Sequence, residues 1–207
     1  MSTVHFIVGH ACNNGCRGCI WSRRLDLLPV AQIPPPEDVR GRGVRLAGRE
    51  PTLRPDLVEI VRALRSAGAT GVEIETNGRM LGVPKFVRSL CDAGVTRLAI
   101  KLFGRDEATW DAHTRVPGSY AQTVRGISVM RRLAPRVDVV AVLVPRRDTG
   151  AGLEALVDLA CELGFRQARV ELRLAKLDLA ALAPLAASVR ALRAHPPDGM
   201  RLDLATA

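Results

Sequence analysis

The chain has few aromatic residues and, for a basic protein, very few lysines. Phe, Trp and Tyr make up 3% of the 207 residues, and only Lys85, Lys101 and Lys176 are lysines among 30 basic residues. Proteins that bind single-stranded nucleic acid stack bases on aromatic side chains, which are scarce here. The formal charge of +9 attracts anions, so nucleic acid stays open as a partner. The arginines are, however, spread over the whole chain, as on an ordinary solvated surface.

Long apolar runs are also absent. No stretch approaches the roughly 18 residues of a membrane span, and the first ten residues lack the basic start and apolar core of a secretory signal. The five cysteines are an odd number and three are crowded together, which does not suit a secreted disulfide framework. We therefore expect a cytoplasmic protein that does not associate with membranes and forms a single domain over residues 1–207.

Short apolar runs alternate with amphipathic stretches along the chain. About six runs predict strands, at residues 4–8, 43–47, 71–75, 97–102, 137–144 and 168–172. Amphipathic periodicity predicts helices at residues 55–67, 83–93, 119–133, 152–163 and 179–194. Strands that alternate with helices imply a parallel sheet with right-handed crossovers and outer helices. The sequence therefore predicts an α/β fold, a partial (β/α)6 TIM-like barrel.

The segment 22–43 interrupts this pattern. It is rich in Pro, Gly and Arg, and its run of three prolines leaves room for at most a short helix around residues 37–40. We predict an irregular loop there, and a barrel that is open beside it.

The loop after the first predicted strand carries Cys12, Cys16 and Cys19 at C-x3-C-x2-C spacing. Thiolates this close along the chain can bind one soft metal centre, and iron–sulfur clusters normally take four of them. Three protein ligands leave a coordination position open, which is typical of catalytic rather than structural metal sites. A closed zinc site completed by His10 is the alternative. Two further cysteines, Cys91 and Cys161, lie in helical stretches and are predicted to be small buried residues.

Unusual residues also follow the next three predicted strands. They are Gly48-Arg49-Glu50-Pro51-Thr52, Thr76-Asn77-Gly78, and Lys101 at the end of the fourth strand. Ligands of parallel α/β sheets bind at the carboxyl ends of the strands, so these residues should meet the cysteine loop at one mouth.

Taken together, these loops resemble the radical S-adenosylmethionine (SAM) enzyme superfamily, whose C-x3-C-x2-C loop, Gly-Gly-Glu-Pro segment and Thr-Asn-Gly segment occur in this order. The resemblance implies that Cys12, Cys16 and Cys19 ligate three irons of a 4Fe–4S cluster and that SAM chelates the fourth. Reductive cleavage of SAM would then give a 5′-deoxyadenosyl radical that abstracts hydrogen from a substrate. The resemblance also implies an electron donor of the flavodoxin or ferredoxin type.

The same resemblance implies four contacts with SAM. Gly48 would let the backbone approach the methionyl end, and Glu50 would accept a hydrogen bond from the methionyl ammonium. Asn77 would reach the ribose or the amino-acid part. Lys101 would pair with the methionyl carboxylate, or else be a solvated lysine at the rim.

The chain departs from the family pattern at two positions. Arg49 replaces the second glycine of the Gly-Gly-Glu-Pro segment, and Gly18 stands where relatives have an aromatic residue, a surface that Trp21 could supply. We also expect no auxiliary-cluster domain after the sixth unit. The mouth would then be broad, which favours a peptide, a protein loop or a partner that closes the site.

Other functions stay open at this point. The Arg excess keeps a nucleic-acid-modifying radical SAM enzyme in view, and the cysteine loop alone also fits a non-catalytic zinc-binding protein. The sequence indicates no catalytic side chain and names no substrate.

Overall fold

The structure is a computed structural model of the chain. It describes residues 2–9, 11–19, 36–145, 152–172 and 179–206. His10, Trp21 and most of the predicted 22–43 loop lie outside the described residues. Within that loop, the predicted short helix is present as α1, Pro36–Val39.

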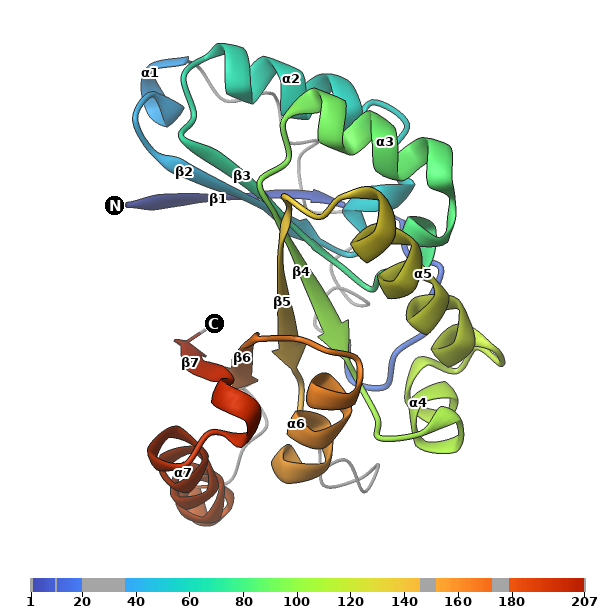
Figure 1. The fold of residues 1–207 in the computed structure, drawn as a ribbon, viewed down its shortest axis with the longest axis vertical. Coiled ribbons are helices and arrows are strands. Elements are labelled where there is room, and N and C mark those ends of the chain that lie inside the picture. The colour runs from blue at the N-terminus through green and yellow to red at the C-terminus, as the bar shows by residue number, and fades with distance from the viewer. Residues whose placement is uncertain (1, 10, 20–35, 146–151, 173–178, 207) are drawn as a thin grey trace.

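The described residues form one sheet of seven strands whose spatial order is the order along the chain. Every neighbouring pair is parallel. The sheet curves, with β1 and β7 at its two edges, and these edge strands are not paired with each other (Figure 1). The predicted partial α/β barrel is confirmed. The strands are β1 Thr3–Gly9, β2 Gly43–Gly48, β3 Gly71–Thr76, β4 Arg97–Leu102, β5 Asp138–Leu143, β6 Gln167–Leu172 and β7 Arg201–Thr206.

The helices lie on the outside of the curved sheet (Figure 1). Helix α2 packs on α3, α3 on α5, and α6 on α7. None of the described helices combines the length and apolar character needed to cross a bilayer. The longer helices are α2 Leu57–Ser66, α3 Pro84–Ala93, α4 Glu107–Thr114, α5 Ser119–Leu133, α6 Leu153–Glu162 and α7 Leu179–Ala194, and the short 3₁₀ helices are η1 Pro51–Leu53, η2 Arg79–Gly82 and η4 Pro197–Gly199.

Helix α2 begins later than predicted, at Leu57 rather than Pro55. Pro55 and Asp56 form a turn instead. The Asp56 carboxylate makes no side-chain cap on α2, because it pairs with Arg54, whose Nε lies 2.6 Å from Oδ1. The apolar face is as predicted and is buried: Leu57, Ile60, Val61 and Leu64.

Two elements were not predicted. Helix α4 has eight residues and a weak apolar periodicity, and its start is fixed instead by a capping box between Asp106 and Thr109. Strand β7 pairs with β6 in register from Gln167↔Arg201 onward, so the sheet has seven strands instead of the expected six or so. Its six residues contain only two large apolar side chains, both leucine, and a short apolar pattern of this kind does not distinguish a strand from a helix.

Several strands have one apolar face and one charged face. On β3, Val72 and Ile74 are buried in the core, whereas Glu73 and Glu75 alternate with them and point to the concave side. Arg45 of β2, Lys101 of β4, and Arg169 and Glu171 of β6 lie on the same side. An ordinary TIM barrel fills its interior with branched apolar side chains, so this concave face is not a packed core.

The turn after β3 packs tightly on α5. Gly126 of α5 lies so close to the turn that a Cβ built on it would be 2.2 Å from the Gly78 carbonyl oxygen. Close packing of α5 therefore fixes the backbone at the carboxyl end of β3.

We predict that Gly126→Ala lowers the free energy of unfolding by about 1–3 kcal/mol, because the methyl group overpacks a backbone contact and outweighs the better helix propensity of Ala. Urea unfolding followed by circular dichroism measures this. Gly82→Ala is the matched control, because its Cβ would have no heavy atom nearer than 4.0 Å. Equal urea midpoints for Gly126→Ala and Gly82→Ala would contradict the close approach of Gly126 to the Gly78 carbonyl group.

Candidate functional site

The three clustered cysteines line one pocket at the carboxyl ends of the first four strands. Cys12, Cys16 and Cys19 are half-buried there. The pocket brings together most of the residues that the sequence analysis singled out. Its other lining residues are Asn14, Gly48, Arg49, Glu75, Thr76, Asn77, Lys101 and Phe103.

Helix α4 supports the cysteine loop from one side. The Gly15 N–H donates to the Thr114 carbonyl at 2.7 Å, and the Arg17 N–H donates to the His113 carbonyl at 2.9 Å. The loop thereby satisfies carbonyl groups at the end of α4 that have no partner inside the helix. Sequence reasoning missed this support because it did not predict α4.

Burial and a hydrogen bond act in opposite directions on the Cys12 thiol. Burial raises its pKa, which favours the neutral thiol, whereas the Asn14 N–H, which donates to Sγ at 3.4 Å, favours the thiolate. Within the part of the chain that the structure describes, no group of three or more His, Cys, Asp or Glu side chains is arranged to hold a metal ion. Three thiols on one pocket nonetheless match the donor chemistry of an iron–sulfur cluster, whose iron atoms are held by separate cysteines.

Glycine at position 48 is required by the neighbouring strand. Its φ is +125°, and a Cβ there would be 2.9 Å from the Gly9 nitrogen. The end of β2 therefore lies directly against the end of β1, where the cysteine loop starts. Gly48 and Arg49 both line the pocket.

Glu50 is a buried carboxylate that joins the ends of β2 and β3. Only 1% of its surface is exposed. Its Oε1 accepts from Thr52 Oγ1 at 2.5 Å and from Thr76 Oγ1 at 2.6 Å, and its Oε2 accepts from the Asn77 N–H at 2.7 Å. Burial raises the pKa of Glu50, although these hydrogen bonds favour the ionised form. Glu50 is not among the pocket-lining residues, so it acts on the pocket through Thr76 and Asn77.

Lys101 is paired inside the barrel. Its Nζ lies 2.7 Å from Glu75 Oε1 and 3.7 Å from Glu171 Oε2, and its side chain is 12% exposed. Burial opposes ionisation of Glu75, but Lys101 and Arg169 outweigh it, and the pKa of Glu75 lies below its ordinary value. Lys101 is therefore a charged pocket residue and not a solvated lysine at the rim.

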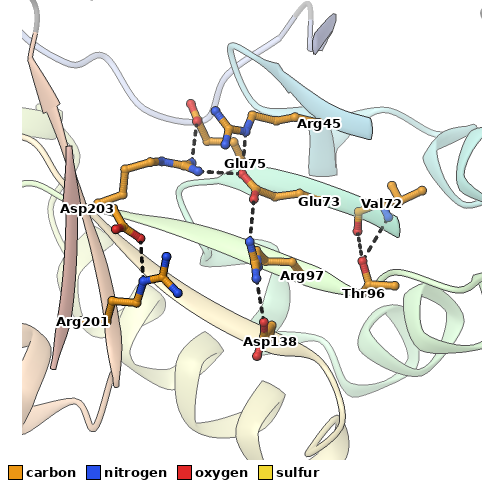
Figure 2. Close-up of polar contacts among 10 residues, drawn as sticks. Arg45, Val72, Glu73, Glu75, Thr96, Arg97, Asp138, Arg201 and Asp203 are labelled. Atoms are coloured by element: carbon orange, nitrogen blue, oxygen red, sulfur yellow. Dashed lines mark hydrogen bonds and ion pairs between the residues drawn. The ribbon is translucent and has the colours of Figure 1, made fainter. Parts of the chain in front are cut away.

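A second carboxylate lies deeper on the concave face. Glu73 lies between Arg45 and Arg97 (Figure 2), with its Oε1 2.6 Å from Arg45 Nε. Arg169 Nη1 lies 3.0 Å from the same oxygen. Arg97 also pairs with Asp138 at 2.8 Å. Charged groups therefore continue from the pocket along the concave face of the sheet.

Comparison with known proteins identifies this arrangement. A family model described as the radical SAM superfamily matches residues 6–160. The chain belongs to the radical SAM superfamily. The fold, the cysteine loop and the neighbouring strand-end residues of this radical SAM protein agree with the resemblance seen in its sequence.

Curated proteins of this superfamily are similar in sequence. The AdoMet-dependent heme synthase of Methanosarcina barkeri is 40% identical over 87 residues, which are 42% of this chain and 24% of that protein. The GTP 3′,8-cyclase of Erythrobacter litoralis is 28% identical over 173 residues, 77% of this chain and 51% of that protein. This radical SAM chain thus spans about half the length, or less, of these curated relatives.

Solved structures share the fold. Streptococcus suis SuiB bound to the precursor peptide SuiA superposes with a TM-score of 0.71 at 15% identity, over 100% of this chain and 49% of SuiB. Native anSMEcpe with bound AdoMet gives a TM-score of 0.69 at 13% identity, over 98% of this chain and 63% of the other. At this identity the likeness establishes the radical SAM fold alone.

We predict that Glu50→Gln lowers the free energy of unfolding by about 1–3 kcal/mol near neutral pH, because the new amide group faces donors that need an acceptor. The raised pKa of Glu50 means that the folded protein binds the proton more tightly than the unfolded chain. Glu50 therefore contributes stability that is fully present below its ordinary pKa of 4.5 and is lost as pH rises through its folded pKa.

The stability advantage of wild type over Glu50→Gln should thus be larger near about pH 4 than near about pH 8, as urea titrations at each pH would measure. Subtracting the free energy of unfolding of Glu50→Gln from that of wild type cancels the pH dependence that all other carboxyl groups contribute to both proteins. A difference that does not change with pH would contradict the effect of burial on Glu50.

Proposed function

We propose that this chain is the catalytic core of a radical SAM enzyme in which Cys12, Cys16 and Cys19 ligate a 4Fe–4S cluster. When bound, the cluster and SAM would supply radical chemistry that begins with transfer of one electron to SAM and leads to abstraction of hydrogen from the substrate. The observation that carries the proposal is that the three thiols share one pocket with the ends of β2, β3 and β4. Membership of the superfamily supports the same chemistry.

The chain's own residues would bind and orient SAM beside the thiols. Gly48 and Asn77 line the pocket. Gly48 would present a backbone edge to the methionyl part. Asn77 would lie beside the ribose or amino-acid part, with its amide oriented by hydrogen bonds to Asn13 and Arg79. Lys101 lines the same pocket and carries the positive charge that a methionyl carboxylate needs. Glu50 would act behind these residues, because its carboxylate already accepts hydrogen bonds from Thr52, Thr76 and Asn77.

An electron donor must reach the pocket from outside, and we propose an acidic protein of the flavodoxin or ferredoxin type. Arg17 and Arg115 are exposed beside the cysteine loop, and the Arg115 side chain lies against Gly15. Two positive charges next to the thiols favour the approach of an acidic carrier.

For the substrate, a peptide or protein segment is our first candidate. The concave face carries paired charges on β2, β3, β4 and β6, which suits a polar chain that can hydrogen bond. SuiB, which shares the fold, is bound to a precursor peptide in its structure.

A nucleoside triphosphate is the second candidate, because a relative similar over most of this chain is a GTP 3′,8-cyclase. Addition of GTP to the reduced enzyme separates the two candidates. If GTP is consumed and 5′-deoxyadenosine formation rises with it, the nucleotide is favoured over the peptide.

We predict that the anaerobically reconstituted protein, reduced in the presence of SAM, forms 5′-deoxyadenosine, and that Cys16→Ala reduces this product to background. Chromatography with mass detection measures the product, and iron and sulfide analysis measures the cluster. Cys91→Ala, on α3, is the matched control and should keep both. A colourless protein that binds one zinc ion instead would falsify the proposal and favour the zinc alternative.

A further inference from the structure

The cysteine loop is also held from the β3 side, by side chains whose contacts with the loop need no bound cofactor. Arg79, at the start of η2, donates through Nη1 to the Asn13 carbonyl and to Asn14 Oδ1, the latter at 2.8 Å. Its Nε donates to Gln122 Oε1 of α5 at 2.8 Å. One guanidinium group therefore links α5 to the segment between Cys12 and Cys16.

Asn77 makes a second link to the same segment. Its Nδ2 donates to Asn13 Oδ1 at 2.7 Å, and its Oδ1 accepts a hydrogen bond from the backbone N–H of Arg79 at 3.0 Å. The backbone of Asn77 is fixed as well, because its N–H donates to Glu50 and its carbonyl accepts from Thr123 Oγ1 at 3.0 Å. Asn77 is 4% exposed, so these bonds are shielded from competing water.

The link through Arg79 leads to one thiol. Arg79 holds the Asn14 side chain, and the Asn14 N–H donates to Cys12 Sγ at 3.4 Å. Hydrogen bonds to the sulfur ligands of an iron–sulfur cluster affect its stability and its reduction potential. The β3 side thus controls both the path of the loop and one hydrogen bond to a ligand sulfur.

We propose that Arg79 and Asn77 are positioning residues that hold the cysteine loop in its ligating conformation before any cluster is present. A loop of this length loses conformational entropy when it is ordered, and fixed side chains that order it in advance lower that loss at cluster assembly. We call Arg79 and Asn77 the loop clamp. A role of this clamp in catalysis rests on the proposed function, whereas its effect on the order of the loop does not.

The test uses thiol alkylation of the cluster-free full-length protein, with each cysteine followed by mass spectrometry. Arg79→Lys keeps the positive charge, but its Nζ ends one bond short of Nη1, the nitrogen that makes both contacts with the loop. Asn77→Ala loses the link to Asn13. In both variants we expect Cys12, Cys16 and Cys19 to react faster, on the order of threefold to tenfold. Cys91 and Cys161, on α3 and α6, are internal references whose rates should stay unchanged.

Gln122→Ala is the matched control. It removes the other partner of Arg79 and leaves its contacts with Asn13 and Asn14 in place, so all five rates should match wild type. Unchanged rates at the three loop cysteines in Arg79→Lys and Asn77→Ala would overturn the proposal. If Asn77→Ala also accelerates Cys91 and Cys161, its fold is disturbed and Arg79→Lys decides the question.

A second measurement connects the clamp to the cluster. After reconstitution, Arg79→Lys should hold less iron and sulfide per chain than Gln122→Ala, and its reduced cluster should show an altered electron paramagnetic resonance spectrum. If wild type takes up no cluster, the proposed function fails, while the alkylation rates still decide whether the clamp exists.

Discussion

Arg169 ties two distant strands of the sheet together across its concave face. It extends from β6 and pairs with Glu73 and Glu75, which lie on β3, at 3.0 and 3.3 Å. Two strands, β4 and β5, separate these partners in the sheet. Because buried charges are stable only when they are paired, the charged faces of β3 and β6 must turn toward each other, and the sheet must curve. The same pairing leaves the barrel with a polar interior in place of a layered apolar core.

The pocket depends on this curvature, because curvature brings the carboxyl ends of four strands to one mouth. Several of the residues that fix the shape of the pocket lie behind its lining. Glu50 is buried and holds the end of β3, the carbonyl groups of α4 receive one side of the cysteine loop, and Arg79 and Asn77 bind the other side. The cysteine loop is thus held on both sides by neighbouring elements, which favours a fixed geometry of its thiol groups.

Local pattern was sufficient to predict most of the fold. The apolar face of α2 and the bounds of β4 and α5 follow from periodicity and turn residues, and the structure agrees. Strand β7 and helix α4 escaped because pairing with β6 and a capping box, rather than apolar periodicity, define them. The cysteine loop and its neighbours could be assigned to one mouth from strand order alone. The hydrogen bonds and ion pairs of Glu50, Asn77 and Lys101 could not be predicted, because they join residues far apart in the sequence.

Lys101 shows how one residue can serve both the interior charges and a ligand. It pairs with Glu75 and also lines the pocket. An anionic ligand that takes Lys101 must not leave Glu75 as a buried charge without a partner. Arg169 already lies 3.3 Å from the second oxygen of Glu75, so that carboxylate keeps a cation when Lys101 turns to the pocket. The ion pair of Arg169 with Glu75 would therefore allow Lys101 to turn toward a carboxylate at the mouth while Glu75 keeps a cationic partner.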